Sequence, residues 1–332
     1  MVQAVADPTR WRMIKAALQR NPGFGQKEND VFKRSLVAIA VVVGGDLATS
    51  ASAFAQADHS ADGTAAPTQV ESGYASVSGL DMYYEIHGAG RPLVLLHGAL
   101  MTIEGFGKLL PPLAKTRQVI AIEQQAHGRT GDIDRPFRYE QMADDTAALL
   151  GEIGIEGADF FGYSMGGAIA LQVAIRHPEL VRKLVLAAPA YSKDGFYPQV
   201  LENIRSLKPE DFAGSPWLEA YTAVAPDPDD WPALVAKVRQ LVGEFVGWPP
   251  EGVQAIAAPA LVIVADSDVV RPEHAVELFR LLGGGVPGDL GGLPRSRLAV
   301  LPGTTHVSLV DRADWLTPMI EEFLDAPTPE AK

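Results

Sequence analysis

One serine stands in a setting that suits nucleophilic catalysis. Residues 161–167 read Phe-Gly-Tyr-Ser-Met-Gly-Gly, so Ser164 occupies the centre of a G-x-S-x-G pattern between an apolar run and an Ala-rich segment. In this context a serine is held on a strained turn from strand to helix, with its hydroxyl exposed. Side chains at Gly162 and Gly166 would collide across so tight a turn. The pattern predicts a nucleophile, against the alternative of a serine that only caps the helix.

A serine hydroxyl is a poor nucleophile at neutral pH, so it needs a neutral imidazole as base and a carboxylate to orient that imidazole. His306 follows the last strand candidate, where a loop at the carboxyl edge of the sheet would present it to the site. His59 lies in a polar linker, His177 at a helix end and His274 at a helix start. We expect these three to be solvated, and we predict that His306 is the base.

Two carboxylates compete for the role of orienting acid. Asp266 and Asp268 both follow the apolar run 260–264, and either could lie over the end of that strand. Asp268 is further into the loop and is the predicted acid, whereas we expect Asp266 to cap the turn or the next helix. The alternative is that both are solvated loop acids.

A reaction at an acyl carbon also needs N–H donors that are fixed before the negative oxygen develops. The amide of Met165, directly after the serine, is one predicted donor of this oxyanion hole. The amide of Ala99 is the other, because Ala99 follows His97 and Gly98 at the end of an earlier strand candidate, and strand ends meet at one edge of the sheet. The alternative is that His97 and Gly98 only turn the chain.

Short apolar runs alternate with helical stretches over most of the chain. Two β-rich segments, 74–78 and 82–87, predict a hairpin. Buried strands are predicted at residues 92–96, 119–122, 159–161, 184–187, 260–265 and 298–301. Helices are predicted at residues 103–114, 139–153, 165–176, 272–282 and 312–324. This alternation predicts an α/β fold with a mostly parallel central sheet and helices on both faces.

One segment interrupts this alternation. Residues 190–257 separate two strand candidates and are rich in aromatic side chains, so they are predicted to be an insertion. The core is then formed by residues 74–189 and 258–325, and residues 326–332 are a C-terminal tail. The Gly-rich segment 283–292 follows a helix rather than a strand, so it is predicted to be a loop and not a phosphate cradle.

The amino-terminal part of the chain differs from the rest. A polar, basic leader precedes the apolar run 36–43, which is too short to span a bilayer, and an Ala-x-Ala pattern ends at Ala55. Residues 1–55 are therefore predicted to be a secretory signal cleaved after Ala55, which would make the protein secreted or periplasmic. The leader is longer than usual, so there are two alternatives: the true start is at Met13, or the apolar run is only a buried element and the leader is retained on a cytoplasmic protein. Residues 56–73 are predicted to be a linker.

The amino-acid composition of the chain limits the kinds of molecule that it can bind. The chain has 332 residues, 47% of them hydrophobic, and a net charge of -13. Without cysteine it can form neither disulfides nor thiolate metal sites. The acidic balance and the lack of a basic patch speak against nucleic acids and membrane surfaces as partners. We predict a small-molecule substrate, no metal, no cofactor and no stable membrane insertion.

These residues together resemble the α/β-hydrolase superfamily, in its serine-dependent, esterase-like branch with a cap domain. The resemblance covers residues 74–325. Four landmarks carry it: His97-Gly98-Ala99, Gly162-Tyr163-Ser164-Met165-Gly166, Asp266-Ser267-Asp268 and Gly303-Thr304-Thr305-His306. The chain order of serine, acid and histidine is that of the family. A fifth segment departs from the family's pattern, since Glu123 stands where Asp is usual and Ala126 stands where Gly is usual.

The resemblance implies hydrolysis of a small or medium carboxylic ester or lactone through an acyl-enzyme. Relatives that open epoxides or displace halide use aspartate at the nucleophile position, so Ser164 speaks against both activities. Carbon-carbon bond hydrolysis and acyl transfer are alternatives in the same fold. A further alternative is a ligand-binding protein that keeps the fold without turnover.

By the same resemblance, the insertion 190–257 would be a helical cap over the substrate pocket. Apolar walls in such a pocket bind the acyl or alcohol part of a substrate and exclude water. Four aromatic residues of the insertion are candidates for the pocket wall: Trp217, Tyr221, Trp231 and Trp248. The alternative for each of them is a place in the insertion's own small core.

Overall fold

The computed structural model describes residues 70–327, and its frame is an eight-stranded sheet in the order β1-β2-β4-β3-β5-β6-β7-β8. Strands β3 to β8 are parallel, and β2 is antiparallel to both of its neighbours. The strands are β1 (Val70–Val77), β2 (Leu80–His87), β3 (Arg91–Leu96), β4 (Arg117–Ile122), β5 (Ala158–Tyr163), β6 (Val181–Ala187), β7 (Ala260–Ser267) and β8 (Arg297–Thr305). The central strands read as continuous apolar runs because both of their faces are buried. The predicted α/β fold is confirmed.

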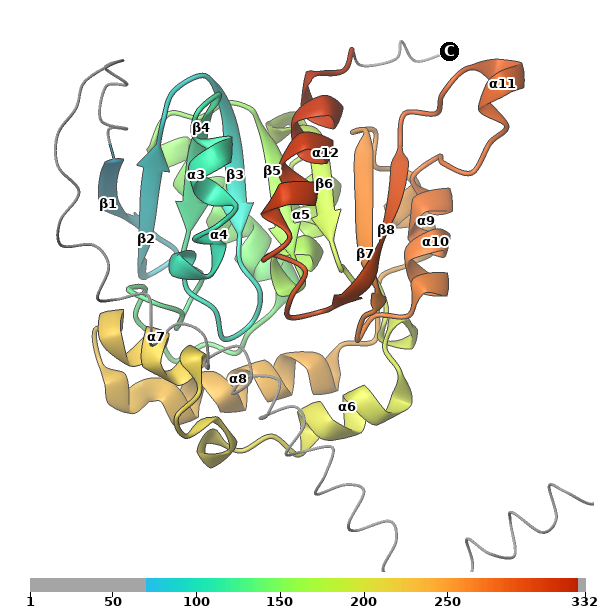
Figure 1. Cartoon of the computed structure of the whole chain (residues 1–332). Helices are drawn as coiled ribbons and strands as arrows, with labels where there is room; N and C mark the ends of the chain where they lie inside the picture. The colour runs from blue at the N-terminus through green and yellow to red at the C-terminus, as the bar shows by residue number, and fades with distance from the viewer. Residues whose placement is uncertain (1–69, 328–332) are drawn as a thin grey trace, which may run out of the picture. The chain divides into compact units, whose positions relative to one another are not determined.

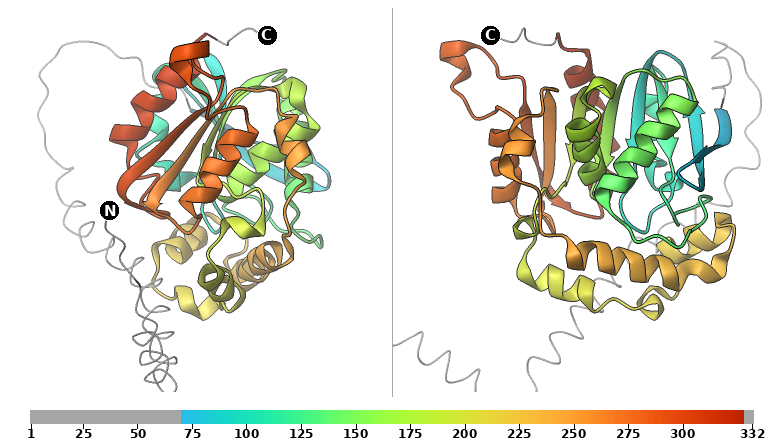
Figure 2. Two further views of the ribbon diagram at one scale, coloured as in Figure 1. Left: turned by 90° about the vertical axis from the view of Figure 1, so that its right-hand side faces the viewer. Right: turned by 180° about the vertical axis from the view of Figure 1, so that it is seen from behind.

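Helices form a layer on each face of the sheet (Figure 1). The face in front in Figure 1 carries α3 (Leu110–Leu113) and α12 (Ala313–Asp325). The other face, seen from behind in Figure 2, carries α4 (Tyr139–Glu152), α5 (Met165–Arg176), α9 (Pro250–Gln254) and α10 (Pro272–Leu281). Each layer packs its own cluster of buried apolar side chains, because successive strand residues point to opposite faces. Phe160 thus belongs to one cluster and Phe161 to the other.

The hairpin at the edge of the sheet begins earlier than predicted. Val70 already pairs with His87, so the last residues of the predicted linker belong to β1. The two strands are joined by a two-residue turn in which Ser78 and Gly79 have φ of 52° and 82°. Both residues need the left-handed conformation, which matches the right-handed twist of the flanking strands.

The predicted helix over residues 103–114 is wrong. This segment forms a 3₁₀ turn at Ile103–Phe106 and one short helical turn, α3. Pro111 and Pro112 have no N–H to donate, so a continuous helix would lose two of its backbone hydrogen bonds here. The predicted Gly-rich loop near the carboxyl terminus contains one helical turn of its own, α11 (Gly288–Gly291).

The insertion contributes α6 (Pro198–Arg205), α7 (Pro216–Val224) and α8 (Trp231–Glu244) between β6 and β7, while its last helix, α9, lies in the helix layer described above. Of the described residues, all but 214–216 belong to one compact unit that includes the sheet. Helices α6, α7 and α8 lie beyond the carboxyl ends of the parallel strands (Figures 1 and 2). An ion pair of 2.7 Å between Lys237 on α8 and Asp132 ties the insertion to the loop after β4.

The predicted signal sequence and most of the predicted linker lie outside the described residues, as do residues 328–332 of the predicted tail. Within residues 70–327, no helix is both long enough and apolar enough to cross a membrane.

Candidate active site

Ser164 lies on the turn between β5 and α5 with φ 53° and ψ −113°. This backbone conformation is rare for L-residues and costs on the order of 1–3 kcal/mol, so the surrounding structure must enforce it. A Cβ on Gly162 would come within 2.3 Å of the carbonyl oxygen of Gly166, and a Cβ on Gly166 within 2.1 Å of that of Leu96. Because both flanking positions are glycine, the chain can close this turn and hold the serine hydroxyl at the amino end of α5.

His306 comes directly after β8, and its imidazole connects the serine to a carboxylate. Nε2 of His306 lies 2.9 Å from Oγ of Ser164, and Nδ1 lies 2.6 Å from Oδ1 of Asp268. Since an ionised carboxylate can only accept, Nδ1 is the donor, which leaves Nε2 as the acceptor for the serine proton. The structure therefore brings the predicted nucleophile, base and acid together from the loops after β5, β8 and β7.

The backbone of its own loop holds the Asp268 carboxylate in place. Oδ2 accepts a hydrogen bond from the amide of Ala265 at 3.1 Å, and Oδ1 accepts one from the amide of Val270, also at 3.1 Å. The side chain of Asp268 is 0% exposed. With the His306 contact, three N–H groups therefore satisfy a carboxylate that has no contact with solvent, and they fix the direction in which it faces.

Asp266, the competing carboxylate, does something other than the predicted capping. Its oxygens accept hydrogen bonds from the amides of Gly303 and Thr304 at 2.9 and 3.1 Å. These two backbone bonds lower the pKa of the exposed Asp266 carboxyl. The pairing of β7 with β8 is irregular at this point, between Ala265 and Ser267. Asp266 thus binds the part of β8 that bulges out just before the histidine. The predicted cap of the next helix is absent, because α10 begins without a side-chain cap.

The two predicted amide donors belong to the turn after β3, which carries Ala99, and to Met165, the first residue of α5 after the serine. Within residues 70–327, neither the N–H of Ala99 nor that of Met165 donates a hydrogen bond to another group. For Met165 the reason is its place at the first position of a helix, where N–H groups have no partner inside the helix. The turn that carries Ala99 is closed by a 3.3 Å bond from the amide of Met101 to the carbonyl of Gly98. Both amides are available to an anionic oxygen.

His97 supports this turn from behind, a role that the sequence analysis missed. The side chain is fully buried, and burial lowers its pKa to about 4, so the imidazole is neutral at physiological pH. Nε2 accepts the amide N–H of Gln124 at 3.1 Å, so Nδ1 carries the proton and donates to the carbonyl of Gly98 at 2.8 Å. The neutral imidazole thereby joins the turn to the end of β4. Its place directly before Gly98 was the only signal in the sequence.

Glu123, one of the two departures from the family's pattern, is a fully buried carboxyl near the same turn. It accepts the amide N–H of Ile103 at 3.2 Å and both the amide and the guanidinium of Arg129, at 2.5 and 3.1 Å. Burial raises its pKa to about 7, against the effect of these bonds. Ala126, the other departure, has φ 61°, in the left-handed region where glycine is less strained. The loop after β4 therefore forms with Glu123 and Ala126 in place of the usual Asp and Gly, and the Glu123 carboxyl binds the amide of Ile103.

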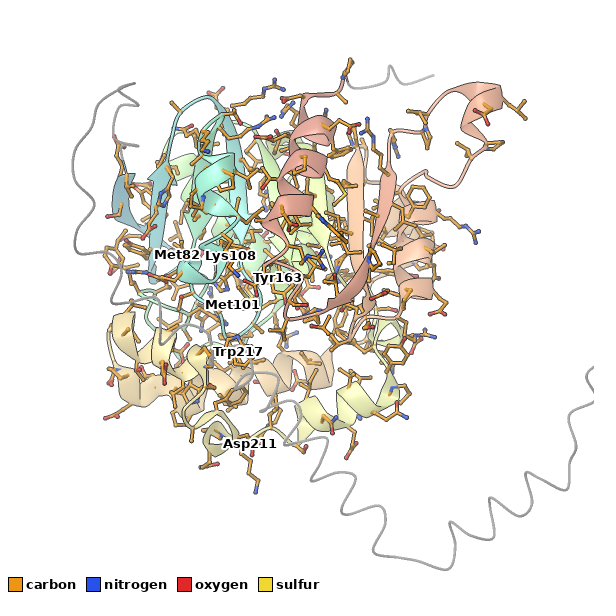
Figure 3. All side chains as sticks on the ribbon, viewed as in Figure 1. Met82, Met101, Lys108, Tyr163, Asp211 and Trp217 are labelled. Atoms are coloured by element: carbon orange, nitrogen blue, oxygen red, sulfur yellow. The ribbon has the colours of Figure 1, made fainter. Side chains whose placement is uncertain are left out.

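Contacts separate the four aromatic pocket candidates. Tyr221 and Trp231 are 3% and 4% exposed, and their ring centroids lie 5.2 Å apart within the insertion's own core. The ring of Trp248 packs edge-on against Tyr139 of α4 at 5.6 Å. These three residues therefore have packing roles. Trp217 is half-buried and packs edge-on against Phe212 of the insertion, with ring centroids 6.5 Å apart. Figure 3 shows it on the side of the insertion that faces the sheet, so it is the candidate that best fits a pocket wall.

The expectation that His274 is solvated is wrong. Its side chain is 1% exposed, stacks on the ring of Tyr191 at 4.5 Å and accepts the Tyr191 amide at 3.2 Å. Burial lowers its pKa to about 4, and the histidine supports the start of the insertion. His177 is half-buried, 2.8 Å from a carboxylate oxygen of Asp144, and His59 lies outside the described residues. In the described part of the chain, no three His, Asp or Glu side chains are grouped so that they could hold a metal ion.

Comparisons with known proteins agree with this architecture. The family model described as alpha/beta hydrolase fold matches residues 91–216. A protein of Azorhizobium caulinodans, provisionally named a carbamate hydrolase, is 30% identical over 236 residues, which cover 64% of this chain and 86% of that protein. A 2-hydroxymuconate semialdehyde hydrolase of a Pseudomonas strain is 39% identical over 107 residues, 31% of this chain and 38% of that protein. The enol-lactonase of Burkholderia xenovorans shares the fold, with a TM-score of 0.57 and 21% identity over 76% of this chain and 100% of that chain.

Proposed function

The chain belongs to the α/β-hydrolase superfamily, and we propose that it is a serine hydrolase that cleaves a small or medium carboxylic ester or lactone through an acyl-enzyme. The observation that carries the proposal is the position of His306, which is hydrogen-bonded to Ser164 on one side and to Asp268 on the other. That arrangement is the one needed to activate a serine hydroxyl. The relatives named above are hydrolases, which supports the same class of reaction.

The proposed reaction has two halves. As Ser164 Oγ bonds to the carbonyl carbon, its proton moves to Nε2 of His306, and the imidazolium gives that proton to the departing alcohol oxygen. In the second half, water loses a proton to Nε2, its oxygen bonds to the acyl carbon, and the proton returns to Ser164. Asp268 stabilises the imidazolium in both halves, and the amides of Ala99 and Met165 bind the negative oxygen of each tetrahedral intermediate.

Side chains around the nucleophile favour an apolar acyl group. Figure 3 shows Met101 between the end of the sheet, where Tyr163 lies next to the nucleophile, and Trp217 of the insertion. Met101 and Trp217 both offer apolar surface, which binds alkyl or aromatic substrate groups and displaces water from the reacting bond. In this proposal the insertion is a cap over the substrate, and Trp217 forms part of its wall.

Carbon-carbon bond hydrolysis is the second candidate. It is favoured by the 39% identity to 2-hydroxymuconate semialdehyde hydrolase over 107 residues. The same serine, histidine and aspartate would serve either reaction, so the two candidates differ only in the substrate that the pocket accepts.

The experiment that tests the proposal is a substrate panel on the full chain and on Ser164→Ala. The panel contains para-nitrophenyl acetate, butyrate and octanoate, a γ-lactone, an anilide and 2-hydroxymuconate semialdehyde. Ester or lactone turnover that disappears in the variant supports the proposal, and turnover of the semialdehyde alone favours the second candidate. Ester products formed on addition of methanol would indicate acyl transfer. A folded wild-type protein that converts none of these compounds would point to a ligand-binding protein without turnover.

We also propose that the protein is exported and that its mature chain begins after Ala55. The apolar run 36–43 and the Ala-x-Ala pattern that ends at Ala55 support this. Amino-terminal sequencing of the protein from fractionated native cells is the test. A cytoplasmic protein that retains residues 1–55 would overturn the export proposal and leave the catalytic one untouched.

A further inference from the structure

Tyr163, the residue before the nucleophile, connects separate parts of the site through one side chain. It is the last residue of β5 and is 4% exposed. Its phenol donates a hydrogen bond of 2.8 Å to the backbone carbonyl oxygen of His306. Figure 3 shows the residue at the end of the sheet nearest the insertion. The hydroxyl is therefore bonded to the main chain of the histidine, while its own main chain continues into Ser164.

The ring of Tyr163 is enclosed on two sides. Its centroid lies 5.2 Å from that of the His306 imidazole, with the ring planes tilted by 34°. On another side it meets the turn that carries Ala99, since a Cβ on Gly98 would lie only 2.9 Å from Cε1 of the tyrosine. Because backbone and imidazole both pack against the ring, the hydroxyl has little freedom to leave the His306 carbonyl.

The phenol of Tyr163 stays protonated at the pH values at which a serine and a histidine can react, so its hydrogen bond does not depend on pH there. Burial raises the pKa of the phenol above its ordinary value, so the oxygen keeps its proton and stays a donor. The His306 carbonyl also accepts the amide N–H of Leu309 at 3.3 Å. Removal of the phenol oxygen would therefore leave the carbonyl with a partner, and the loop would still be closed.

We propose that Tyr163 is a positioning residue that sets the distance between Nε2 of His306 and Oγ of Ser164. This inference rests on the proposed function, since it concerns the proton transfer between these two atoms. Ser164 is joined to Tyr163 by a peptide bond, so a bond from Tyr163 to the main chain of His306 holds both partners of the transfer in one frame. A displacement of about 1 Å in a reacting site can lower a rate by about 100-fold.

The test compares Tyr163→Phe with Tyr83→Phe, using two readouts on the full chain. Tyr83 is a matched control because it is 9% exposed and its phenol also donates a hydrogen bond, to Glu85 at 2.9 Å, outside the site. The first readout is the rate at which a fluorophosphonate labels Ser164, a reaction in which the serine oxygen displaces fluoride from phosphorus and His306 accepts the proton. The second is the separation of kcat and KM for para-nitrophenyl acetate.

We expect Tyr163→Phe to lower both the labelling rate and kcat by about tenfold or more with little change in KM, because only the alignment of the transfer is lost. Tyr83→Phe should leave both unchanged. Placing 4-aminophenylalanine at residue 163 restores an N–H donor at the same position and should recover most of the rate. This second substitution also serves if the phenylalanine variant does not fold.

Two results would overturn the inference. One is a folded Tyr163→Phe protein that is labelled at the wild-type rate. The other is a loss of rate that 4-aminophenylalanine does not recover, which would mean that the hydroxyl acts only through packing. Failure of the wild-type protein to react with either reagent would instead refute the proposed function, so the two failures can be told apart.

Discussion

Replacing Asp268 by Asn tests the site most sharply, because the carboxylate is satisfied by three N–H donors and an amide cannot serve all three. Oδ1 of Asp268 faces His306 Nδ1 at 2.6 Å and the Val270 amide at 3.1 Å, while Oδ2 faces the Ala265 amide at 3.1 Å. If the new NH₂ group points at Ala265, one donor meets another. If it points at His306 and Val270, it meets the N–H donor of Val270, and the imidazole must carry its proton on Nε2 instead of Nδ1. A protonated Nε2 cannot accept the hydrogen bond from Ser164.

Both orientations lose one buried hydrogen bond, so the free energy of unfolding should fall by about 1–3 kcal/mol. In both, a neutral amide replaces the charge that stabilises the imidazolium. Loss of a buried triad aspartate costs about 10⁴-fold in rate elsewhere. We therefore expect kcat/KM of Asp268→Asn to fall by about 10⁴-fold, which corresponds to about 5 kcal/mol of transition-state stabilisation.

Asp266→Asn is the matched control, since it lies in the same loop and also accepts two backbone hydrogen bonds. Its carboxylate is solvent-exposed and does not touch the histidine, so we expect kcat/KM to fall by less than about tenfold. The assay is hydrolysis of para-nitrophenyl acetate, with thermal unfolding of each variant alongside. If Asp266→Asn is the more damaging change, the reasoning from the hydrogen bonds of Asp268 is refuted.

Three further predictions concern the nucleophile, the pocket and the response to acid. Ser164→Ala should lower kcat by at least about a thousandfold with an unchanged Tm, because it removes the covalent step and no packing contact; near wild-type turnover would contradict it. Trp217→Ala should raise KM or change the preferred ester chain length at nearly constant Tm, whereas Trp231→Ala should mainly lower Tm; equal effects of the two would show that Trp217 only packs. Burial holds the pKa of His274 at about 4 in the folded protein, so the unfolded chain binds the proton first and the free energy of unfolding should fall as pH drops from about 6.5 to about 4. His274→Gln should make this decline shallower in urea titrations at several pH values, and an identical slope would disprove the contribution.

Much of the architecture could be predicted because its causes are local. A strand that is covered on both faces must be apolar throughout, so β3 to β6 were visible as short continuous runs. The predicted helix over residues 103–114 is wrong because Pro111 and Pro112 have no N–H to donate, which breaks a helix whatever its apolar pattern. The burial of His274 could not be predicted, for a different reason. Its burial comes from Tyr191, a residue far away in the sequence, and no local pattern reports such a contact.

The sequence by itself determined the chemical groups and the edge of the sheet at which they gather. Glycines beside Ser164 permit the strained turn, and parallel strands bring the ends of β5, β7 and β8 to the same side. Only the tertiary structure decided which of two aspartates, two residues apart, faces His306. That choice depends on the irregular pairing of β7 with β8, where Asp266 is drawn toward the amides of Gly303 and Thr304 and Asp268 turns inward to the imidazole. A carboxylate's direction is set by the N–H groups around it, and folding brings those groups from another strand.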